Sequence, residues 1–299
     1  MNKIEDFNLL VEKALRIPGR ALMRPAIAKE LLHYDILFCL DSHGLLDTLT
    51  FQGGTSLRLC YGAVRFSEDL DFAGGRDFAT ANLIAMKDCL EKYLGKRYGL
   101  EIIVKEPKEM ATLPKYEDIK VDKWQISVTT APEKKDIPKQ KIKIEVANVS
   151  AYSRVPRALQ QNYEFLPDGY SDTLIMTETL DEIMADKLIS LVSCKRYIRY
   201  RDIWDLRWLK QQGAKINSEF ILAKIHDYKE IHYLENLRNM IGQLNEIVRS
   251  KSFQDEMTRF IPNDVLEKTL QKEKFIDFVI NENTSLLLQV EQIVETKLK

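Results

Sequence analysis

Two short segments of the sequence combine small, basic and acidic residues in a pattern that suits phosphate chemistry. They are residues 51–57, FQGGTSL, and residues 65–72, RFSEDLDF. Alternate residues of an extended strand point to the same face, so Asp69 and Asp71 project together while Leu70 faces a core. Mg²⁺ prefers hard oxygen ligands and is usually held by one or two carboxylates with water and phosphates. The Asp69–Asp71 pair therefore predicts a magnesium site.

The first segment has the features of a phosphate cradle. Gly53 and Gly54 let the backbone approach a ligand closely, because neither carries a Cβ atom. A helix beginning near Thr55 would direct its free N–H groups at an anion. Thr55 or Ser56 would either cap that helix or bind a phosphate oxygen.

The two segments are more informative together than alone. Short Gly and Asp motifs arise often by chance, and the alternative is a Gly-Gly turn between a strand and a helix with two solvated aspartates. The joint occurrence of the segments, with Arg65 and Ser67 ahead of the two aspartates, favours a nucleotide site. We assign Arg65 and Ser67 to its nucleotide-binding residues.

The composition is that of a globular protein. The 299 residues are 45% apolar and 30% charged, which favours a soluble chain of two domains, or of one domain with a large extension. The 44 basic and 45 acidic residues nearly cancel, so the net charge of −1 predicts no general affinity for polyanions. No run approaches the ~20 apolar residues of a membrane span, and residues 1–16 lack the apolar core of a signal peptide. We expect a cytoplasmic protein without membrane contact.

The cysteines and histidines show no metal-ligand spacing. No Cys-x-x-Cys occurs, and the histidines form no pattern beside the cysteines, so a zinc site is not expected. Reduced thiols, buried or half-buried, are the better interpretation. The residues are Cys39, Cys60, Cys89, Cys194, His33, His43, His226 and His232.

The periodicity of the apolar residues predicts an α+β fold. The N-terminal part is expected to be a mixed β-sheet domain with flanking helices. Its predicted elements are a helix over 24–46, a strand over 47–51, a helix over 55–61, a strand over 69–72, a helix over 76–95 that ends near Gly95, and β-rich stretches over 100–106, 119–130 and 139–149.

The last of these stretches has a consequence for chemistry. Ile142, Ile144 and Val146 share one strand face, so Glu145 lies on the other. If this strand pairs beside the one that carries Asp69 and Asp71, Glu145 becomes a third carboxylate near the metal. A solvent-facing glutamate on a charged strand face is the alternative, and both interpretations remain open.

Helical patterns replace strands after residue 150. A linker containing Pro156, Pro167 and Gly169 precedes predicted helices over 179–193 and 199–211. Further helical spacing follows from residue 218, with breaks expected near 262–263 and 281–283. The predicted organisation is a catalytic domain over 1–155 and an all-helical domain over 156–299 that completes the active-site cleft.

The segment 187–215 is basic and aromatic. It holds eight basic residues against two acids, with two tyrosines and two tryptophans between them. Such a segment suits phosphate and nucleic-acid backbones, although Trp204 and Trp208 also fit a stripe packed in a core. We assign the aromatic residues mainly to the core and the basic residues mainly to phosphate or RNA. The basic residues are Lys187, Lys195, Arg196, Arg199, Arg201, Arg207, Lys210 and Lys215.

The glycine segment, the acidic segment and residues 201–206, RDIWDL, together resemble the AbiEii/AbiGii-type nucleotidyltransferase toxins. This family belongs to the DNA polymerase β-like nucleotidyltransferase superfamily. The resemblance covers about residues 45 to 210 and depends on the ordered set of motifs, which is more specific than any single one.

The resemblance implies roles for the later residues. Lys187 matches a lysine in an Ala-Asp-Lys-Leu helix, and Arg201, Asp202 and Asp205 match an Arg-Asp-x-x-Asp motif. Lys187 and Arg201 are then expected to contact nucleotide phosphates, and Asp202 to orient Lys187 or an incoming hydroxyl. Asp205 would bind Arg201 or a neighbouring helix. A purely structural ion-pair network is the competing interpretation. The resemblance also implies a third acidic residue on a later strand, the place of Glu145.

The expected activity is Mg²⁺-dependent nucleotidyl transfer from a nucleoside triphosphate (NTP). With the resemblance, the expected acceptor is RNA, at the 3′ end of tRNA, in a toxin–antitoxin or abortive-infection system for phage defence with a cognate antitoxin. Three alternatives stay open. They are transfer to a protein or small-molecule hydroxyl, nucleotide binding without turnover, and a non-enzymatic interaction role for the helical region 216–299.

Overall fold

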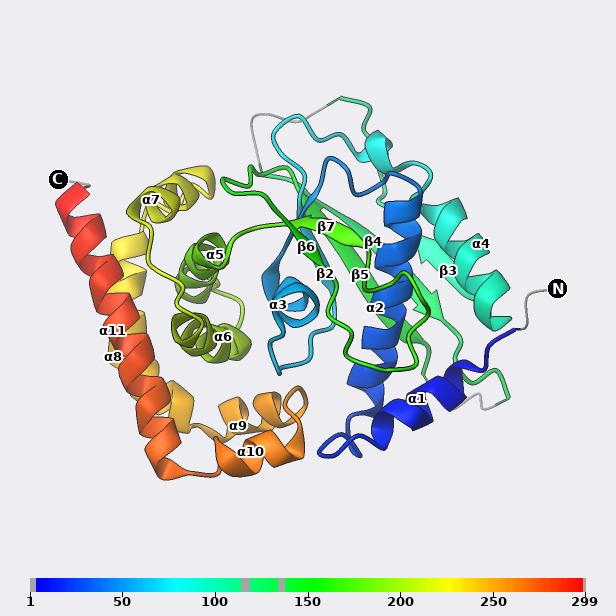
Figure 1. Cartoon of the computed structure of the whole chain (residues 1–299). Coiled ribbons are helices and arrows are strands. Elements are labelled where there is room, and N and C mark those ends of the chain that lie inside the picture. Colours follow the sequence, from blue (N-terminus) through cyan, green and yellow to red (C-terminus); the bar gives the residue numbers. More distant parts are fainter. Residues whose placement is uncertain (1–3, 114–118, 134–137, 298–299) are drawn as a thin grey trace. The chain divides into compact units, whose positions relative to one another are not determined.

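The computed structural model describes residues 4–113, 119–133 and 138–297 (Figure 1). The chain divides into two compact units, residues 1–178 and 179–299. The boundary expected at 155/156 lies in the structure at 178/179, because two strands that follow residue 154 join the sheet of the first unit.

Seven strands form one mixed sheet in the described part of the first unit, in the order β3-β4-β5-β2-β1-β7-β6. Their bounds are β1 Thr50–Gln52, β2 Leu70–Ala73, β3 Ile102–Lys105, β4 Val121–Val128, β5 Gln140–Ala147, β6 Val155–Ala158 and β7 Leu174–Thr177. The sequence predicted β1 to β5 but placed a linker where β6 and β7 lie. Pro156 is compatible with β6 because this strand forms the sheet edge, where a missing N–H is tolerated.

The two faces of the sheet differ in character. Leu70, Phe72, Trp124, Ile144 and Val146 are buried on one face. Helices α2, Arg24–Ser42, and α4, Met86–Tyr98, pack on this apolar face. The residues that alternate with the buried ones on β2, β4 and β5 are polar or charged, except at one end of the sheet, where Ala73, Ala147 and Val121 are paired. A sheet with one packed face leaves its other face for polar residues.

The N-terminal unit has two further α-helices among the described residues, α1, Phe7–Leu15, and α3, Gly53–Tyr61. The helix predicted over 76–95 is wrong at both ends, since α4 follows a 3-10 turn over Thr80–Leu83 and continues through Gly95. It stops at Gly99, which has φ +64°, and the Gly99 amide donates to the Gly95 carbonyl at 2.8 Å. Glycine is the residue that adopts this conformation without strain.

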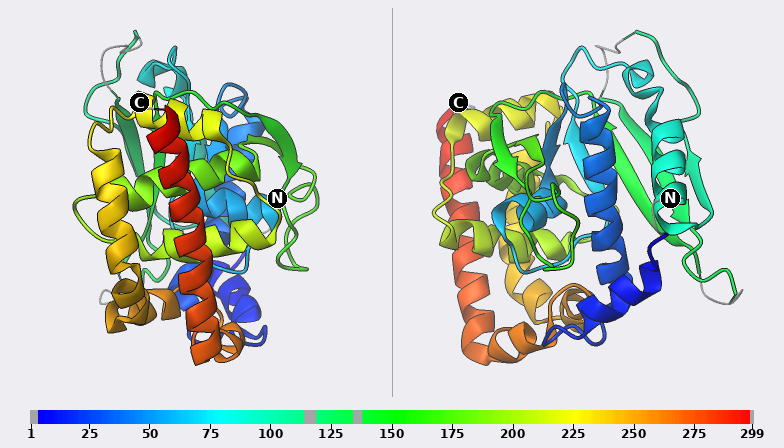
Figure 2. Two further views of the ribbon diagram at one scale, coloured as in Figure 1. Left: turned by 90° about the vertical axis from the view of Figure 1, so that its left-hand side faces the viewer. Right: turned by 45° about the vertical axis from the view of Figure 1, so that its right-hand side comes forward.

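Helices alone, without strands, make up the regular structure among the described residues of the second unit, which confirms the predicted α+β class with a helical C-terminal region. Its helices are α5 Leu180–Ser193, α6 Tyr200–Gln211, α7 Ser218–Asp227, α8 Tyr233–Arg249, α9 Lys251–Thr258, α10 Asn263–Lys268 and α11 Glu273–Lys297. Helices α8 and α11 run side by side (Figure 2). Arg238 of α8 contacts Glu291 and Glu295, whereas Arg249 contacts Glu273 and Asp277, so the two helices are antiparallel.

The break expected at 281–283 is absent, because α11 is continuous through it. Asn283 is fully buried, and its Nδ2 atom donates to the Val279 carbonyl at 2.9 Å and to the Ile203 carbonyl at 3.1 Å. The asparagine side chain, which can compete with the helix backbone for hydrogen bonds, thus connects α11 to α6. The break near Pro262 is confirmed, since α9 ends at Thr258 and α10 begins at Asn263. None of the helices in the described residues is long and apolar enough to cross a membrane.

Candidate active site

Strand β1 delivers the chain into α3 at the two glycines. Gly53 has φ +76°, and a Cβ atom built there would lie 3.0 Å from Asp71 Oδ2. The residue before it, Gln52, is paired in register with Asp71 on the antiparallel neighbour β2. The glycine turn and the second aspartate are therefore in direct contact distance, and only a residue without a side chain fits between them.

Gly54 faces the other half of the acidic segment. A Cβ atom there would lie 2.5 Å from Arg65 Nη2 and 3.1 Å from Ser67 Oγ. Arg65 is 3% exposed, and its Nη1 donates to the Phe66 carbonyl at 2.7 Å. The structure thus brings together the glycines with Arg65, Ser67 and Asp71, as the joint occurrence of the two segments predicted.

The hydroxyl groups that follow the glycines do not cap α3. The helix begins at Gly53 with Gln52 as N-cap and without a side-chain cap bond, so Thr55 and Ser56 lie inside its first turn. Thr55 Oγ1 donates to the Asp69 carbonyl, and Ser56 Oγ donates to the Gly53 carbonyl at 3.0 Å. The capping interpretation is therefore wrong. Thr55 instead fixes the backbone at the first aspartate, and binding of phosphate by either hydroxyl stays a prediction.

The acidic residues lie at neighbouring register positions on the polar sheet face. Strand β5 pairs with β2 in parallel, with Glu145 directly opposite Asp71. Asp69, one residue before β2, accepts a hydrogen bond from the Lys143 amide at Oδ1, 3.1 Å away, and its Oδ2 lies 3.7 Å from Lys143 Nζ. The pairing on which the third-carboxylate interpretation depended is present. Glu145 also binds Lys123 at 2.9 Å, so its role as a metal ligand stays a prediction.

The ligand chemistry of these residues is that of a magnesium site, and their role as metal ligands stays a prediction. Asp69, Asp71 and Glu145 offer only carboxylate oxygens, the ligand type that Mg²⁺ prefers. The space that a Cβ atom would fill at Gly53 lies beside one of these oxygens. Gln52 contributes a further polar group there, since its Oε1 atom is buried and has no hydrogen-bond partner among the described residues. Sequence reasoning missed Gln52, because only the strand pairing places it opposite Asp71.

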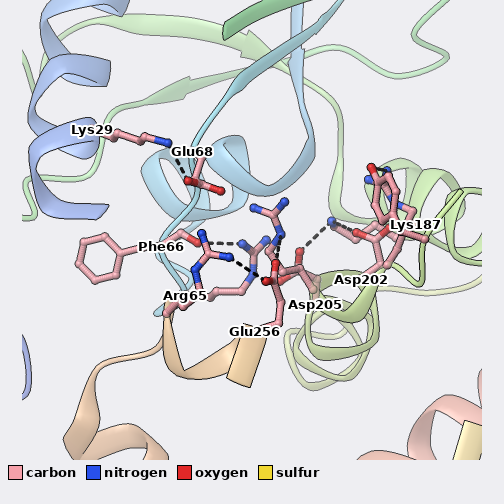
Figure 3. Close-up of polar contacts among 12 residues, drawn as sticks. Lys29, Arg65, Phe66, Glu68, Lys187, Asp202, Asp205 and Glu256 are labelled. Carbon is pink, nitrogen blue, oxygen red and sulfur yellow. Dashed lines mark hydrogen bonds and ion pairs between the residues drawn. The ribbon is translucent and has the colours of Figure 1, made fainter. Parts of the chain in front are cut away.

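Helix α2 supports the acidic segment from the side. Lys29 Nζ lies 2.6 Å from Glu68 Oε1 (Figure 3), and His33, one turn further on, has its Nε2 atom 2.9 Å from the Glu68 carbonyl. A carbonyl oxygen can only accept, so the ring carries its proton on Nε2. Burial lowers the pKa of His33 to about 4, which keeps the imidazole neutral. The i,i+4 spacing of Lys29 and His33 was visible in the sequence, but their partner was not.

In the second unit, Lys187 of α5 is buried between two carboxylates of α6. Its Nζ atom lies 3.0 Å from Asp202 Oδ1 and 2.7 Å from Asp205 Oδ2 (Figure 3). Asp202 also accepts from Ser190 Oγ at 2.7 Å and from Arg199. Burial alone would raise the pKa of Asp202, but Lys187 and Arg199 hold it below its usual range. Asp202 and Asp205 therefore both contact Lys187, and the role of these residues in the reaction stays a prediction.

The remaining basic residues of 187–215 are largely engaged within the helical unit. Arg201 Nε lies 3.5 Å from Glu256, and its guanidinium sits 4.7 Å from the centre of the Phe260 ring. Arg207 is buried over Trp204, and Lys210 pairs with Glu282 at 2.8 Å. Trp204 and Trp208 are buried, as predicted. Most of these basic residues thus have partners within the helical unit, and their assignment to phosphate or RNA stays a prediction.

One group of potential soft-metal ligands lies apart from this site. Side-chain atoms of Cys39, His43 and Cys89 come within 4.8 Å of one another at α2 and α4. Cys39 Sγ donates to the Cys89 carbonyl at 3.5 Å, and Cys89 Sγ donates to the Met86 carbonyl at 3.2 Å. Sequence spacing did not reveal this group, because the two cysteines lie on different helices.

Comparison with known proteins gives a family and a fold. The family described as "Nucleotidyl transferase AbiEii toxin, Type IV TA system" matches residues 35–280. No curated protein matches the chain significantly. MenT4, a nucleotidyltransferase toxin from Mycobacterium tuberculosis, superposes with a TM-score of 0.57 at 18% identity, over 97% of this chain and 98% of that one. At this identity the similarity establishes the fold alone.

Two Helicobacter pylori proteins are more distant. One superposes with a TM-score of 0.48 at 17% identity over 90% of this chain and 97% of its own. The other, JHP933, has a TM-score of 0.38 at 18% identity over 90% of this chain and 95% of its own. Neither score establishes a shared fold.

Proposed function

This chain belongs to the AbiEii family of nucleotidyltransferase toxins of type IV toxin–antitoxin systems, and on that premise we propose that it transfers a nucleoside monophosphate from an NTP to RNA. The observation that carries this proposal is the contact between the two glycines and the acidic segment. Gly53 lies close against Asp71, and Gly54 lies close against Arg65 and Ser67. A triphosphate bound there would meet backbone N–H groups of α3, a guanidinium and carboxylates that share a metal.

Different residues of the chain would bind the metal ion and the phosphates. Asp69, Asp71 and Glu145 would hold Mg²⁺, which when bound supplies the positive charge that neutralises the triphosphate. The amides at the start of α3 and Arg65 would align the phosphates. The acceptor hydroxyl oxygen forms a bond to the α-phosphorus, the bond from that phosphorus to the bridging oxygen breaks, and pyrophosphate leaves while the hydroxyl proton passes to solvent. Such transfer needs alignment and charge neutralisation rather than covalent help.

Lys187, Asp202 and Arg201 of the helical unit are proposed to act in the same reaction. Asp202 and Asp205 hold the Lys187 ammonium from two sides, so its position is fixed. A fixed ammonium suits contact with a phosphate. The structural ion-pair interpretation predicts instead that Lys187 matters for stability alone.

The biological setting follows the family. We propose that the acceptor is the 3′ end of tRNA in the cytoplasm, that the modification arrests growth as a phage-defence response, and that a cognate antitoxin relieves it. The family's toxin–antitoxin classification supports the antitoxin partner.

A transfer assay tests the proposal. Purified protein is incubated with Mg²⁺, each α-labelled NTP and total RNA, and label in RNA is measured beside the Asp71→Asn variant and an exposed control, Asp172→Asn. The expected result is RNA labelling that Asp71→Asn removes and Asp172→Asn retains. Absence of label in RNA under all four NTPs would overturn the RNA acceptor, and label in added protein or small molecules would identify the alternative class of acceptor.

A further inference from the structure

The polar face of the sheet continues from the candidate metal residues toward β3. One row of paired positions runs from Asp71 on β2 through Glu145 on β5 to Lys123 on β4. The neighbouring row runs from Lys143 on β5 through Gln125 on β4 to Lys105 on β3. The Lys143 amide binds Asp69, so both rows begin at the carboxylates. The acidic site therefore leads directly into a basic surface.

A cavity of about 460 Å³ lies on this surface. We call this cavity the lysine groove. It is lined by residues 105–109, which begin at the last residue of β3, by residues 120–125 at the start of β4, and by Lys143 of β5. Five of the lining residues are lysines and three are acids. Lys120 is paired with the buried Asp122 at 2.7 Å. Lys123 and Lys143 contact the candidate metal residues outside the lining, Glu145 at 2.9 Å and Asp69 at 3.7 Å. The lining itself thus has two more lysines than acids, and two of these lysines connect it to the acidic site.

The lining chemistry indicates what the groove binds. Lys105, Lys108, Lys123 and Lys143 are exposed, and ammonium groups on flexible stems act as point charges for phosphates. Trp124 also lines the groove but is fully buried, so its ring is not available for stacking on a base. This combination favours contact with a phosphate backbone over recognition of bases.

We propose that the lysine groove binds the phosphodiester backbone of the acceptor RNA strand and leads its 3′ hydroxyl to Asp69 and Asp71. This inference rests on the proposed function, since it names the acceptor's binding surface. Neighbouring strands lie about 4.8 Å apart, so Lys123 is about 10 Å and Lys105 about 14 Å from the strand that carries the two aspartates. The groove would therefore contact RNA nucleotides that precede the 3′-terminal one, and not the terminal nucleotide itself.

The consequence is a binding mode that depends on salt and tolerates sequence. Each neutralised phosphate of a single strand contributes about 0.7 to the slope of log Kd against log salt concentration. Replacing Lys105 and Lys108 should therefore lower that slope by about 1.4 if both contact phosphates. Binding of the NTP, which we assign to the glycine cradle, should not change.

The test uses the full-length Asp71→Asn protein, so that no transfer occurs during the measurement. Binding of a fluorescein-labelled single-stranded RNA of mixed sequence is followed by anisotropy over a salt series. The Lys105→Ala/Lys108→Ala variant is compared with Lys92→Ala/Lys96→Ala, two exposed lysines of α4, which packs on the opposite face of the sheet. Lys105→Arg/Lys108→Arg keeps the charge, and thermal melting verifies folding.

The expected result is weaker RNA binding and a smaller salt slope for the groove alanine pair alone, with restoration by arginine and an unchanged Kd for NTP. Equal RNA binding by both alanine variants would overturn the proposed role of the groove. Labelling of RNA by the wild-type protein would still support the proposed transferase activity in that case. Loss of NTP binding in the groove variant would also overturn the proposed role of the groove, because the lysines would then serve the nucleotide. If wild-type protein labels no RNA at all, the proposed function fails first.

Discussion

Asp71 and Glu145 occupy directly opposed positions on the parallel strands β2 and β5. Opposed residues on paired strands share a face, so both carboxylates lie on the polar side of the sheet. Glu145 also forms an ion pair with Lys123 of β4, at 2.9 Å. The two carboxylates are therefore neighbours on the sheet, and Glu145 is in contact with a lysine of the next strand.

The proposed ligand roles of the two carboxylates predict a graded loss of activity. Asp71→Asn should reduce kcat/KM by at least about 100-fold, because a lost metal ligand removes several kcal/mol of charge stabilisation. Glu145→Gln should reduce it about 10- to 100-fold, the range for residues that support a metal ligand set. Steady-state transfer rates over a Mg²⁺ titration check this, and the Glu145→Gln enzyme should need more Mg²⁺.

The control for Glu145→Gln is Lys123→Ala, which removes the ion pair without removing the carboxylate. Retained Mg²⁺ dependence in Lys123→Ala separates loss of a ligand from loss of the ion pair. An unchanged Mg²⁺ requirement in Glu145→Gln would contradict the role of Glu145 as a third carboxylate.

Gly54→Ala should damage nucleotide binding. The added Cβ atom would lie 2.5 Å from Arg65 Nη2 and 3.1 Å from Ser67 Oγ, so the buried guanidinium must move. We expect the free energy of unfolding to fall by about 1–3 kcal/mol, as for other overpacked sites, and the Kd for NTP to rise at least about tenfold.

Gly242→Ala is the matched control, because no atom lies within 4 Å of the added Cβ atom in α8. That change should stabilise the helix by up to about 1 kcal/mol. Equal NTP affinity in both variants would disprove the cradle.

Local patterns in the sequence were sufficient for part of the site. The alternation around Asp69 and around Glu145 gave the correct polar faces, because strand periodicity is a property of the chain itself. The Gly53–Gly54 turn was likewise visible, since few other residues adopt such a conformation. What the sequence lacked was the parallel pairing of β5 with β2, which joins residues far apart in the chain.

The errors have the same origin. Strands β6 and β7 are four residues each, and one of them contains Pro156, so their local signal is that of a linker. Only their pairing with each other and with β1 makes them strands. Asn283 likewise had the local character of a helix break, and its partner, the Ile203 carbonyl, lies 80 residues away. Tertiary contacts decided each of these cases.

The buried pair of Lys187 and Asp202 should contribute strongly to stability. The pKa of Asp202 lies below its ordinary value of about 3.9, so its contribution is fully present above about pH 4 and is lost as the pH falls through the folded-state pKa. Asp202→Asn should cost about 3 kcal/mol at pH 7, the lower end for a broken buried pair, because Asp205 still binds Lys187. Denaturant unfolding measures this against Glu282→Gln, which breaks the more exposed pair with Lys210 and should cost at most about 1 kcal/mol. Equal losses of unfolding free energy in the two variants would show that the buried ion pair contributes no more to stability than the exposed one.

His33 should make the stability of the protein sensitive to mild acid. Its pKa is about 4 in the folded chain and about 6.5 when unfolded, so the unfolded state takes up a proton first as the pH falls. Stability should decline between pH 6.5 and 4 by on the order of 3 kcal/mol relative to His33→Gln, which keeps a donor for the Glu68 carbonyl but cannot titrate. Asp35, whose pKa burial raises to about 6, acts in the opposite direction over part of this interval, but it is present in both proteins and cancels in the difference. Denaturant unfolding at several pH values gives that difference directly, and parallel stability profiles for the two proteins would rule out His33 as the source of the acid sensitivity.

Because the Glu68 carbonyl immediately precedes Asp69, His33→Ala should in addition reduce transfer activity at pH 7.5, where the imidazole is neutral, whereas His33→Gln should largely retain it.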